Sequence, residues 1–245
     1  MEIGWPFLAA LFGAFCLGVS KAGFPGLALV NVVIALEVFG EKASIGIVLP
    51  MLVFCDILVY PLFRKYSSWR AAIPLLLISL IGIVIGWAVL DRIDDQITRR
   101  IIGGIILFML VLQLTRKFQE NFLRTLPGSK GFLVGSGLAI GFTTMMANAA
   151  GAVYSIYGLV HRMPKFEFMG LSARLFLLIN IIKLPFLADL NLITKESLQI
   201  NLMLVPGILV GIFLGKNLLK RIPQTLFEWL LYAFSAVAAV RLLLF

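Results

Sequence analysis

Charged residues are scarce in this chain of 245 residues: they make up 13% of it, whereas hydrophobic residues make up 61%. An ordinary soluble domain is roughly 45–50% apolar and about 25% charged. With a mean hydropathy of +1.03, the chain carries more apolar surface than a water-exposed fold of its length can hide. The composition argues against a soluble enzyme, a secreted scaffold and a disordered chain. It predicts an all-α polytopic membrane protein.

Histidine and cysteine are also scarce. The chain has one histidine, His161, and two cysteines, Cys16 and Cys55, which lie in apolar runs without a CxxC spacing. Such a set does not supply the ligands of a zinc cluster. It also leaves no Ser/His/Asp or Cys/His arrangement for hydrolysis. We therefore expect no metal site, no cofactor and no enzymatic activity.

Ten apolar runs fill most of the chain, and they lie at about 5–20, 26–39, 44–63, 71–90, 97–115, 131–147, 150–160, 167–187, 197–219 and 224–244. A membrane-spanning helix needs about 20 residues, so several of these runs can cross a bilayer. The longest polar break divides the runs into five and five. We predict a first repeat at 1–117, a cytoplasmic linker at 118–130 and a second repeat at 131–245, joined in one transmembrane domain.

Matching residues recur in the two halves at nearly constant spacing. The pairs 124 positions apart are Gly46 and Gly170, Asp56 and Asn180, and Pro61 and Pro185; those 129 apart are Gly82 and Gly211, and Gly86 and Gly215. Self-similarity at a fixed period indicates an internal duplication. Chance matches between glycines in apolar sequence are the alternative.

The loops between the runs differ in charge, and the net charge of the chain is +9. Loops 64–70, 116–130, 161–167 and 216–222 are rich in Lys and Arg, whereas 37–43, 91–100 and 188–196 are poor in bases or mix them with acids. By the positive-inside rule the first group faces the cytoplasm, and both termini then lie outside it. Equivalent loops of the two halves face opposite sides. This predicts two inverted repeats, a plan that is frequent among secondary transporters.

The first two runs of each half are short and meet at a glycine-rich break. The breaks are Gly18–Gly26 and Gly141–Gly151. We predict that each is a hairpin of two half-helices meeting near mid-membrane, followed by three transmembrane helices. Non-helical backbone at that depth is tolerated only against protein or a wet cavity, and free amides at helix N-termini favour an anion. A plain turn between two full helices is the alternative.

Four ionisable residues lie within or beside apolar runs, where such groups are costly and usually functional. Lys21 and Arg174 would compensate an anion, and Lys183, nearer the outer end, would admit it; snorkelling is the alternative for both Arg174 and Lys183. Asp56 is the only acid deep in a run, and it could carry a coupling proton because burial disfavours its charged form. Its counterpart Asn180 is neutral. An ion pair of Asp56 with Lys21 or Arg174 that merely holds helices together is the structural alternative.

The candidate residues therefore form three groups. The substrate-binding candidates are Ser20, Lys21, Gly23, Gly26, Thr143, Thr144, Asn148, Gly151 and Arg174. The coupling candidates are Asp56 and Asn180, and Lys183 is the residue at the mouth of the pathway. Because cationic and neutral donors outnumber acids, the substrate is expected to be an anion.

The two glycine-rich breaks resemble the repeat signatures of the sulfite exporter TauE/SafE family (TSUP), and Lys165–Gly170 and the stretch 219–223 also fit its pattern. The resemblance covers nearly the whole chain. It implies a bacterial inner-membrane permease for sulfite, sulfoacetate or another organosulfonate. The signature residues that it carries over are Gly18, Gly23, Gly26, Gly141 and Gly151, with Lys21, Thr143, Thr144 and Asn148 beside them. The resemblance assigns no role to Asp56, Arg174 or Lys183, whose proposed roles depend only on their expected burial.

The expected partners are a small anion, a coupling proton or sodium ion, and the lipid bilayer, with a homodimer left open and no nucleic acid. Two rival interpretations remain. A membrane enzyme such as a lipid pyrophosphate phosphatase would need paired Glu or a Ser/Arg/His cluster near the breaks. A non-catalytic subunit of a partner pump would give no flux from the purified chain alone. The sequence leaves the exact substrate and the direction of transport open.

Overall fold

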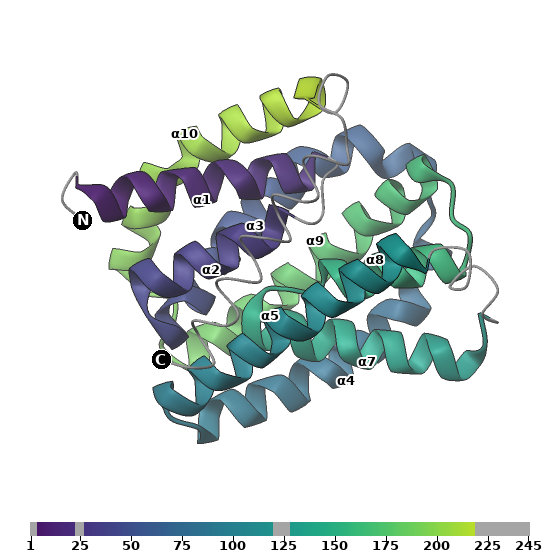
Figure 1. The fold of residues 1–245 in the computed structure, drawn as a ribbon, viewed down its shortest axis with the longest axis horizontal. Helices are drawn as coiled ribbons and strands as arrows, with labels where there is room; N and C mark the ends of the chain where they lie inside the picture. Colours follow the sequence, from purple (N-terminus) through teal and green to yellow (C-terminus); the bar gives the residue numbers. More distant parts are fainter. Residues whose placement is uncertain (1–3, 23–26, 120–127, 219–245) are drawn as a thin grey trace.

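The structure is a computed structural model that describes residues 4–22, 27–119 and 128–218 (Figure 1). These residues form helices without any strand. In chain order the elements are α1 (Trp5–Lys21), α2 (Ala28–Phe39), α3 (Glu41–Phe63), the 3₁₀ turn η2 (Arg64–Tyr66), α4 (Trp69–Arg92), α5 (Asp95–Phe118), α7 (Lys130–Ala147), α8 (Gly151–Val160), α9 (Lys165–Asp189) and α10 (Lys195–Leu218).

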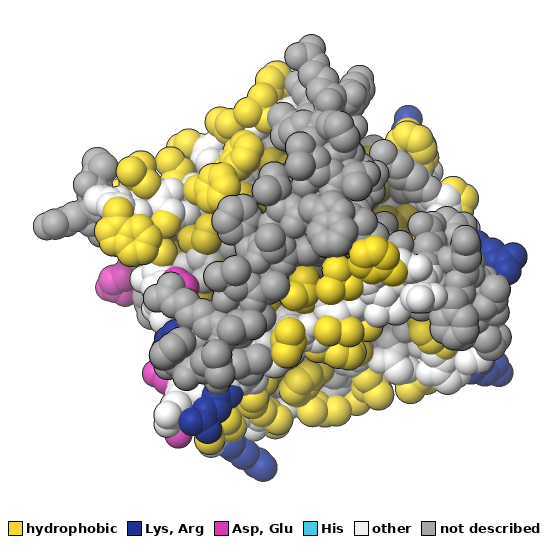
Figure 2. Space-filling view, in the orientation of Figure 1, with side chains coloured by type: hydrophobic (Ala, Val, Ile, Leu, Met, Phe, Trp, Pro, Cys, Tyr) yellow, Lys and Arg dark blue, Asp and Glu magenta, His cyan; other side chains and the backbone are white. Residues whose placement is uncertain are grey.

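Helix length and composition fit a membrane fold. Within the described ranges, five segments are long and apolar enough to cross a bilayer: Glu41–Tyr66, Trp69–Arg92, Lys130–Ala147, Phe166–Asp189 and Lys195–Gly215. Helices α1, α2 and α8 are apolar but shorter. Among the described residues on the face drawn in Figure 2, the side chains between the two ends are mostly apolar and the charged ones lie toward the ends. The prediction of an all-α polytopic membrane protein is confirmed.

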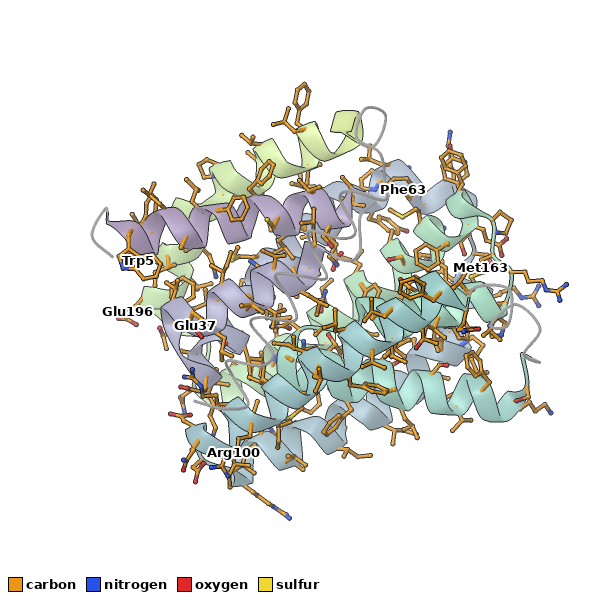
Figure 3. The ribbon with its side chains drawn as sticks, in the orientation of Figure 1. Trp5, Glu37, Phe63, Arg100, Met163 and Glu196 are labelled. Atoms are coloured by element: carbon orange, nitrogen blue, oxygen red, sulfur yellow. The ribbon has the colours of Figure 1, made fainter. Side chains whose placement is uncertain are left out.

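The long helices lie roughly along one axis, up and down in turn, so their loops gather at two ends of the molecule (Figure 1). One end carries the labelled residues Trp5, Glu37, Arg100 and Glu196, and the other carries Phe63 and Met163 (Figure 3). Loops 64–70 and 161–167 therefore share an end, which we call the base-rich end. Loops 37–43, 91–100 and 188–196 share the opposite end. This grouping agrees with the loop charges, while the membrane side that each end faces stays a prediction.

Reporter fusions test that sidedness. A fusion after Tyr66, at the base-rich end, is expected to read as cytoplasmic, because positive loops are retained inside. A fusion after Asp95, at the opposite end, is expected to read as external. A third fusion at position 245, which lies outside the described residues, is expected to read as external too. Cytoplasmic readings at both 95 and 245 would contradict the opposite orientation of the two halves.

Two helix pairs are packed at backbone contact: α1 lies along α10, and α4 lies along α7. A Cβ at Gly18 would overlap the carbonyl oxygen of Ile208, and a Cβ at Gly141 would overlap that of Ser79. Small residues permit such close approach between membrane helices. Ser79 and Ile208 are 129 positions apart in the sequence. The two halves thus make the same contact, and each pair joins the first helix of one half to the fourth helix of the other.

The breaks are narrower than predicted. Helix α1 continues through Lys21 and α7 through Ala147, so Gly18 and Gly141 lie inside helices as contact residues. The Thr143 hydroxyl donates to the Ala139 carbonyl oxygen at 2.6 Å, which satisfies it within the helix. Helix α7 ends where Asn148 adopts a left-handed φ of 52°, and α8 begins three residues later. Gly23 and Gly26 lie outside the described residues.

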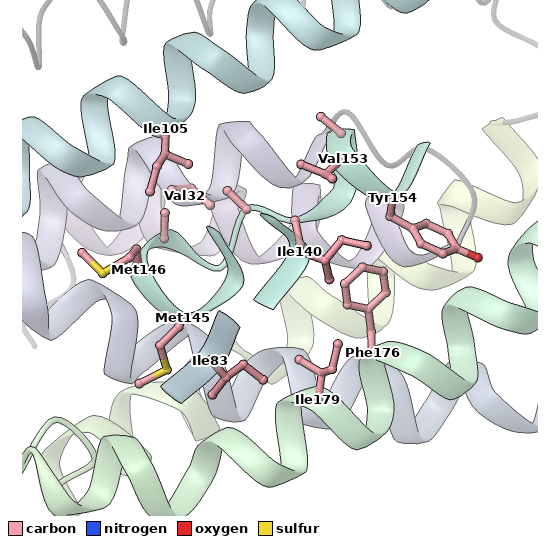
Figure 4. Close-up of a cluster of buried hydrophobic side chains, with 14 of the residues drawn as sticks. Val32, Ile83, Ile105, Ile140, Met145, Met146, Val153, Tyr154, Phe176 and Ile179 are labelled. Atoms are coloured by element: carbon pink, nitrogen blue, oxygen red, sulfur yellow. The ribbon is translucent and has the colours of Figure 1, made fainter. Parts of the chain in front are cut away.

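An apolar core surrounds the second break. Its labelled members in Figure 4 are Val32, Ile83, Ile105, Ile140, Met145, Met146, Val153, Tyr154, Phe176 and Ile179, which come from α2, α4, α5, α7, α8 and α9. The rings of Tyr154 and Phe176 meet edge to face, with centroids 5.4 Å apart. Because helices from both halves contribute, the core holds the ends of the short helices at fixed positions around a central cavity.

Candidate anion-binding site

A cavity of about 70 Å³ lies where the short helices end. On the same scale, one water molecule needs roughly 10–15 Å³, so there is room for a small anion. The lining residues are Ser20, Lys21, Ala28, Leu52, Asp56, Val59, Thr144, Asn148, Ala150, Gly151, Tyr154, Phe168, Met169, Ser172, Ala173, Phe176 and Asn180. They come from α1, α2, α3, α7, α8 and α9 and from the second break.

Two helix amino ends open onto this cavity. Ala28 is the first residue of α2 and Gly151 the first of α8, and both line it. The N-cap residues, Leu27 and Ala150, provide no side-chain hydrogen bond. The first N–H groups of a helix have no partner within it, and together with the helix dipole they favour negative charge. Both amino ends are therefore suited to an anion.

An ion pair occupies one wall of the cavity. The Lys21 ammonium lies 2.5 Å from Asp56 Oδ1, and the Asn180 amide donates to Asp56 Oδ2 at 2.7 Å. Asp56 is only 2% exposed. Lys21 Nζ also lies 5.1 Å from the centre of the Phe176 ring. Asp56 and Asn180, which the sequence paired as repeat counterparts, thus touch each other where α3 meets α9.

Lys183 does not extend toward the outer surface, as a residue at the mouth of the pathway would. Its side chain is fully buried, and its ammonium donates to the Thr144 carbonyl oxygen and to Asn148 Oδ1 at 2.6 Å. These acceptors lie at the carboxyl end of α7, where a helix favours positive charge. The Asn148 amide in turn donates to the Ile45 carbonyl oxygen at 3.0 Å. Lys183, which does not itself line the cavity, therefore holds the lining residues Thr144 and Asn148 in place.

The structure brings most of the predicted site residues together. Those that line the cavity are Ser20, Lys21, Thr144, Asn148 and Gly151, with the coupling candidates Asp56 and Asn180. Thr143 and Arg174 are not among the lining residues. The Arg174 guanidinium lies instead 5.3 Å from the Trp69 ring centre and 5.7 Å from that of Tyr60. Side chains on a helix lean toward its amino end, and this direction carries Arg174 toward the base-rich end.

An aromatic wall was not predicted. Tyr154, Phe168 and Phe176 line the cavity, and the Tyr154 hydroxyl donates to the Phe168 carbonyl oxygen at 2.7 Å. In a chain with 20 phenylalanines, an aromatic residue in an apolar run gives no local signal of a site. The wall limits the room for substrate and keeps the surroundings of the ion pair apolar, which strengthens electrostatic interactions inside.

The charged groups in and behind the cavity wall are two lysines and one aspartate. Lys21 is paired with Asp56, whereas the hydrogen bonds of the Lys183 ammonium are to neutral acceptors on Thr144 and Asn148. Within the described ranges Asp56 is the only carboxylate that lines the cavity, and no group of His, Cys, Asp and Glu could hold a metal. The described lining thus has donors from two helix amino ends and from Lys21, and one carboxylate.

A multi-pass helical membrane protein with a buried cationic cavity between interrupted helices has the architecture of a membrane transporter for anions. The family described as sulfite exporter TauE/SafE has a model that matches residues 7–242. The chain therefore belongs to the sulfite exporter TauE/SafE family, as the resemblance in its glycine-rich breaks indicated. No curated protein and no solved structure matches the chain.

Proposed function

We propose that this protein is a secondary transporter that moves sulfite or another compact sulfur-containing anion across the bacterial inner membrane. The observation that carries the proposal is the convergence of the Lys21 ammonium and two helix amino ends, neither with a side-chain cap, on one cavity. Backbone N–H groups and an ammonium together suit an oxyanion with several acceptor oxygens. The cavity volume of about 70 Å³ favours sulfite over bulkier organosulfonates such as sulfoacetate.

Asp56 would couple transport to a proton. Its two oxygens are already bonded to Lys21 and Asn180, which favours a proton over a sodium ion, since sodium would need free oxygen ligands. Protonation of Asp56 would weaken its pair with Lys21 and leave the ammonium available to the anion. Proton and anion would then bind together, so that a proton gradient drives anion movement.

Alternating access by two inverted repeats, at 1–117 and 131–245, is part of this proposal. It is supported by the equivalent contacts of Gly18 with Ile208 and of Gly141 with Ser79, and by the contact between the counterparts Asp56 and Asn180. In such transporters one half rocks against the other around a fixed site. Here the site would lie between α3 and α9, which belong to different halves.

Substitution in the cavity is expected to weaken anion binding. Lys21→Ala and Asn148→Ala should each raise the Kd for sulfite about tenfold or more, because a hydrogen bond to a charged group contributes roughly 1.5–3 kcal/mol. Thr143→Ala is the matched control: it removes a buried hydroxyl next to Thr144 that bonds within its own helix. Calorimetry on purified protein, with a folding check for each variant, measures the effect. Unchanged affinity in both cavity variants would locate the site elsewhere.

Flux measurements separate the proposal from its rivals. The purified chain in liposomes is expected to move sulfite without any partner, whereas a subunit of a pump would not. The same liposomes should release no phosphate from a lipid pyrophosphate, since Asp56 is the single carboxylate among the cavity residues that the structure describes. Competition by sulfoacetate, taurine, thiosulfate and sulfate then ranks the substrates.

A further inference from the structure

Arg174 has hydrogen-bonding capacity that the protein itself does not use. The residue is only 8% exposed, and its Nε and Nη1 atoms are buried without a hydrogen-bond partner. In the parts of the chain that the structure describes, it forms no ion pair with Glu167 or any other acid. Buried donors of a charged group are costly when unmatched. Its guanidinium nevertheless lies over the neighbouring rings of Trp69 and Tyr60, whose centroids are 6.1 Å apart.

A second buried donor, Ser67, lies on the loop that packs against the same face of α9. Ser67 Oγ is also buried without a partner. A Cβ at Gly170 would lie only 3.0 Å from Ser67 Cβ, so the loop that carries Ser67 rests on α9 at Gly170. Gly170 and Arg174 are four residues apart and share one helix face. The hydroxyl and the guanidinium therefore both belong to the region where the loop 64–68 packs on α9.

The surroundings of this region are basic and aromatic. Arg64, Lys65 and Arg70 are exposed on the loop between α3 and α4 and on the first turn of α4. Trp69 is 38% exposed and Phe166 55% exposed. Tryptophan and other aromatic residues gather at membrane–water interfaces, and basic clusters beside transmembrane helices on the cytoplasmic side attract anionic lipid headgroups.

We propose that Arg174 and Ser67 bind an oxyanion group at the base-rich membrane interface, separate from the central cavity. The fork of guanidinium donors matches the paired oxygens of a phosphate. The exposed aromatic side chains favour the phosphate of an anionic lipid headgroup as the occupant, because the acyl chains of such a lipid would lie against them. A free oxyanion would use the same two donors.

The test is lipid binding to the delipidated, purified full-length chain, measured by native mass spectrometry and thermal unfolding. Dioleoylphosphatidylglycerol is compared with dioleoylphosphatidylcholine, and inorganic phosphate is titrated separately. We expect phosphatidylglycerol to bind about tenfold more tightly than phosphatidylcholine. Arg174→Gln should remove that preference, since a charged hydrogen bond contributes about tenfold or more in affinity. Arg70→Gln, which removes the same charge from an exposed position, should keep it.

The outcomes divide clearly. Loss of the lipid preference in Arg174→Gln but not in Arg70→Gln supports the headgroup site. Stabilisation by inorganic phosphate in the wild type alone, without lipid preference, supports the oxyanion site with a free ion as occupant. An equal loss of the lipid preference in Arg174→Gln and Arg70→Gln, or no loss in Arg174→Gln, would overturn the proposal. If Arg174→Gln does not fold, Ser67→Ala decides: it should reduce the preference for phosphatidylglycerol a few-fold, and an unchanged preference would overturn the proposal.

Discussion

Replacement of Asp56 by alanine is expected to abolish sulfite transport and to lower the free energy of unfolding by about 3–5 kcal/mol, the cost of breaking a buried ion pair from one side. The change leaves the Lys21 ammonium and the Asn180 amide without the acceptor that they share. Both groups are largely shielded from water, and an uncompensated charge is more costly there than in water. Unfolding in mixed micelles and flux in liposomes measure the two effects.

Two further variants separate stability from coupling. Asp56→Asn keeps the shape of the side chain. It should therefore retain more of the wild-type affinity for sulfite than of the wild-type transport rate under a pH gradient. The double variant Lys21→Met with Asp56→Leu should recover part of the lost stability, because removing both charges is less costly than removing one. A wild-type rate of transport in Asp56→Asn under a pH gradient would show that Asp56 carries no coupling proton.

The addition of one methyl group at Gly141 is expected to have the second large effect. Gly141→Ala should lower the free energy of unfolding by about 3 kcal/mol, at the upper end of the usual cost of overpacking. The new Cβ would overlap the Ser79 carbonyl oxygen and crowd the Ile83 amide nitrogen. These are backbone atoms, which cannot move aside unless α4 and α7 separate. Unfolding in mixed micelles reports the loss.

Gly135 provides the matched control on the same helix. A Cβ at Gly135 would meet nothing within 4 Å. Gly135→Ala should therefore be neutral or slightly stabilising, because alanine favours a helix over glycine by up to about 1 kcal/mol. Equal destabilisation by the two substitutions would mean that the contact between α4 and α7 does not depend on close approach at Gly141.

Most of the polar residues that line the cavity were predictable, for a local reason, whereas its apolar and aromatic residues were not. Ser20, Lys21, Asn148 and Gly151 lie in or beside glycine-rich breaks, and a break in an apolar run is visible without knowing the fold. Asp56 stood out because a carboxylate in a membrane segment is costly. What could not be predicted was where α7 ends: Thr143 and Thr144 remain helical, and the Thr143 hydroxyl bonds back to the Ala139 carbonyl oxygen inside α7.

By itself, the sequence determined that the chain is an all-α membrane protein, where its helices are interrupted, and which charges lie among apolar residues. These properties follow from composition and from short-range pattern. Only the tertiary structure decided the directions of Lys183 and Arg174, two cations on one helix. Lys183 finds buried acceptors at the end of α7, whereas Arg174 leans over two neighbouring rings toward the base-rich end. The direction of a long side chain depends on the partners that neighbouring helices present, and the packing of distant segments sets those partners.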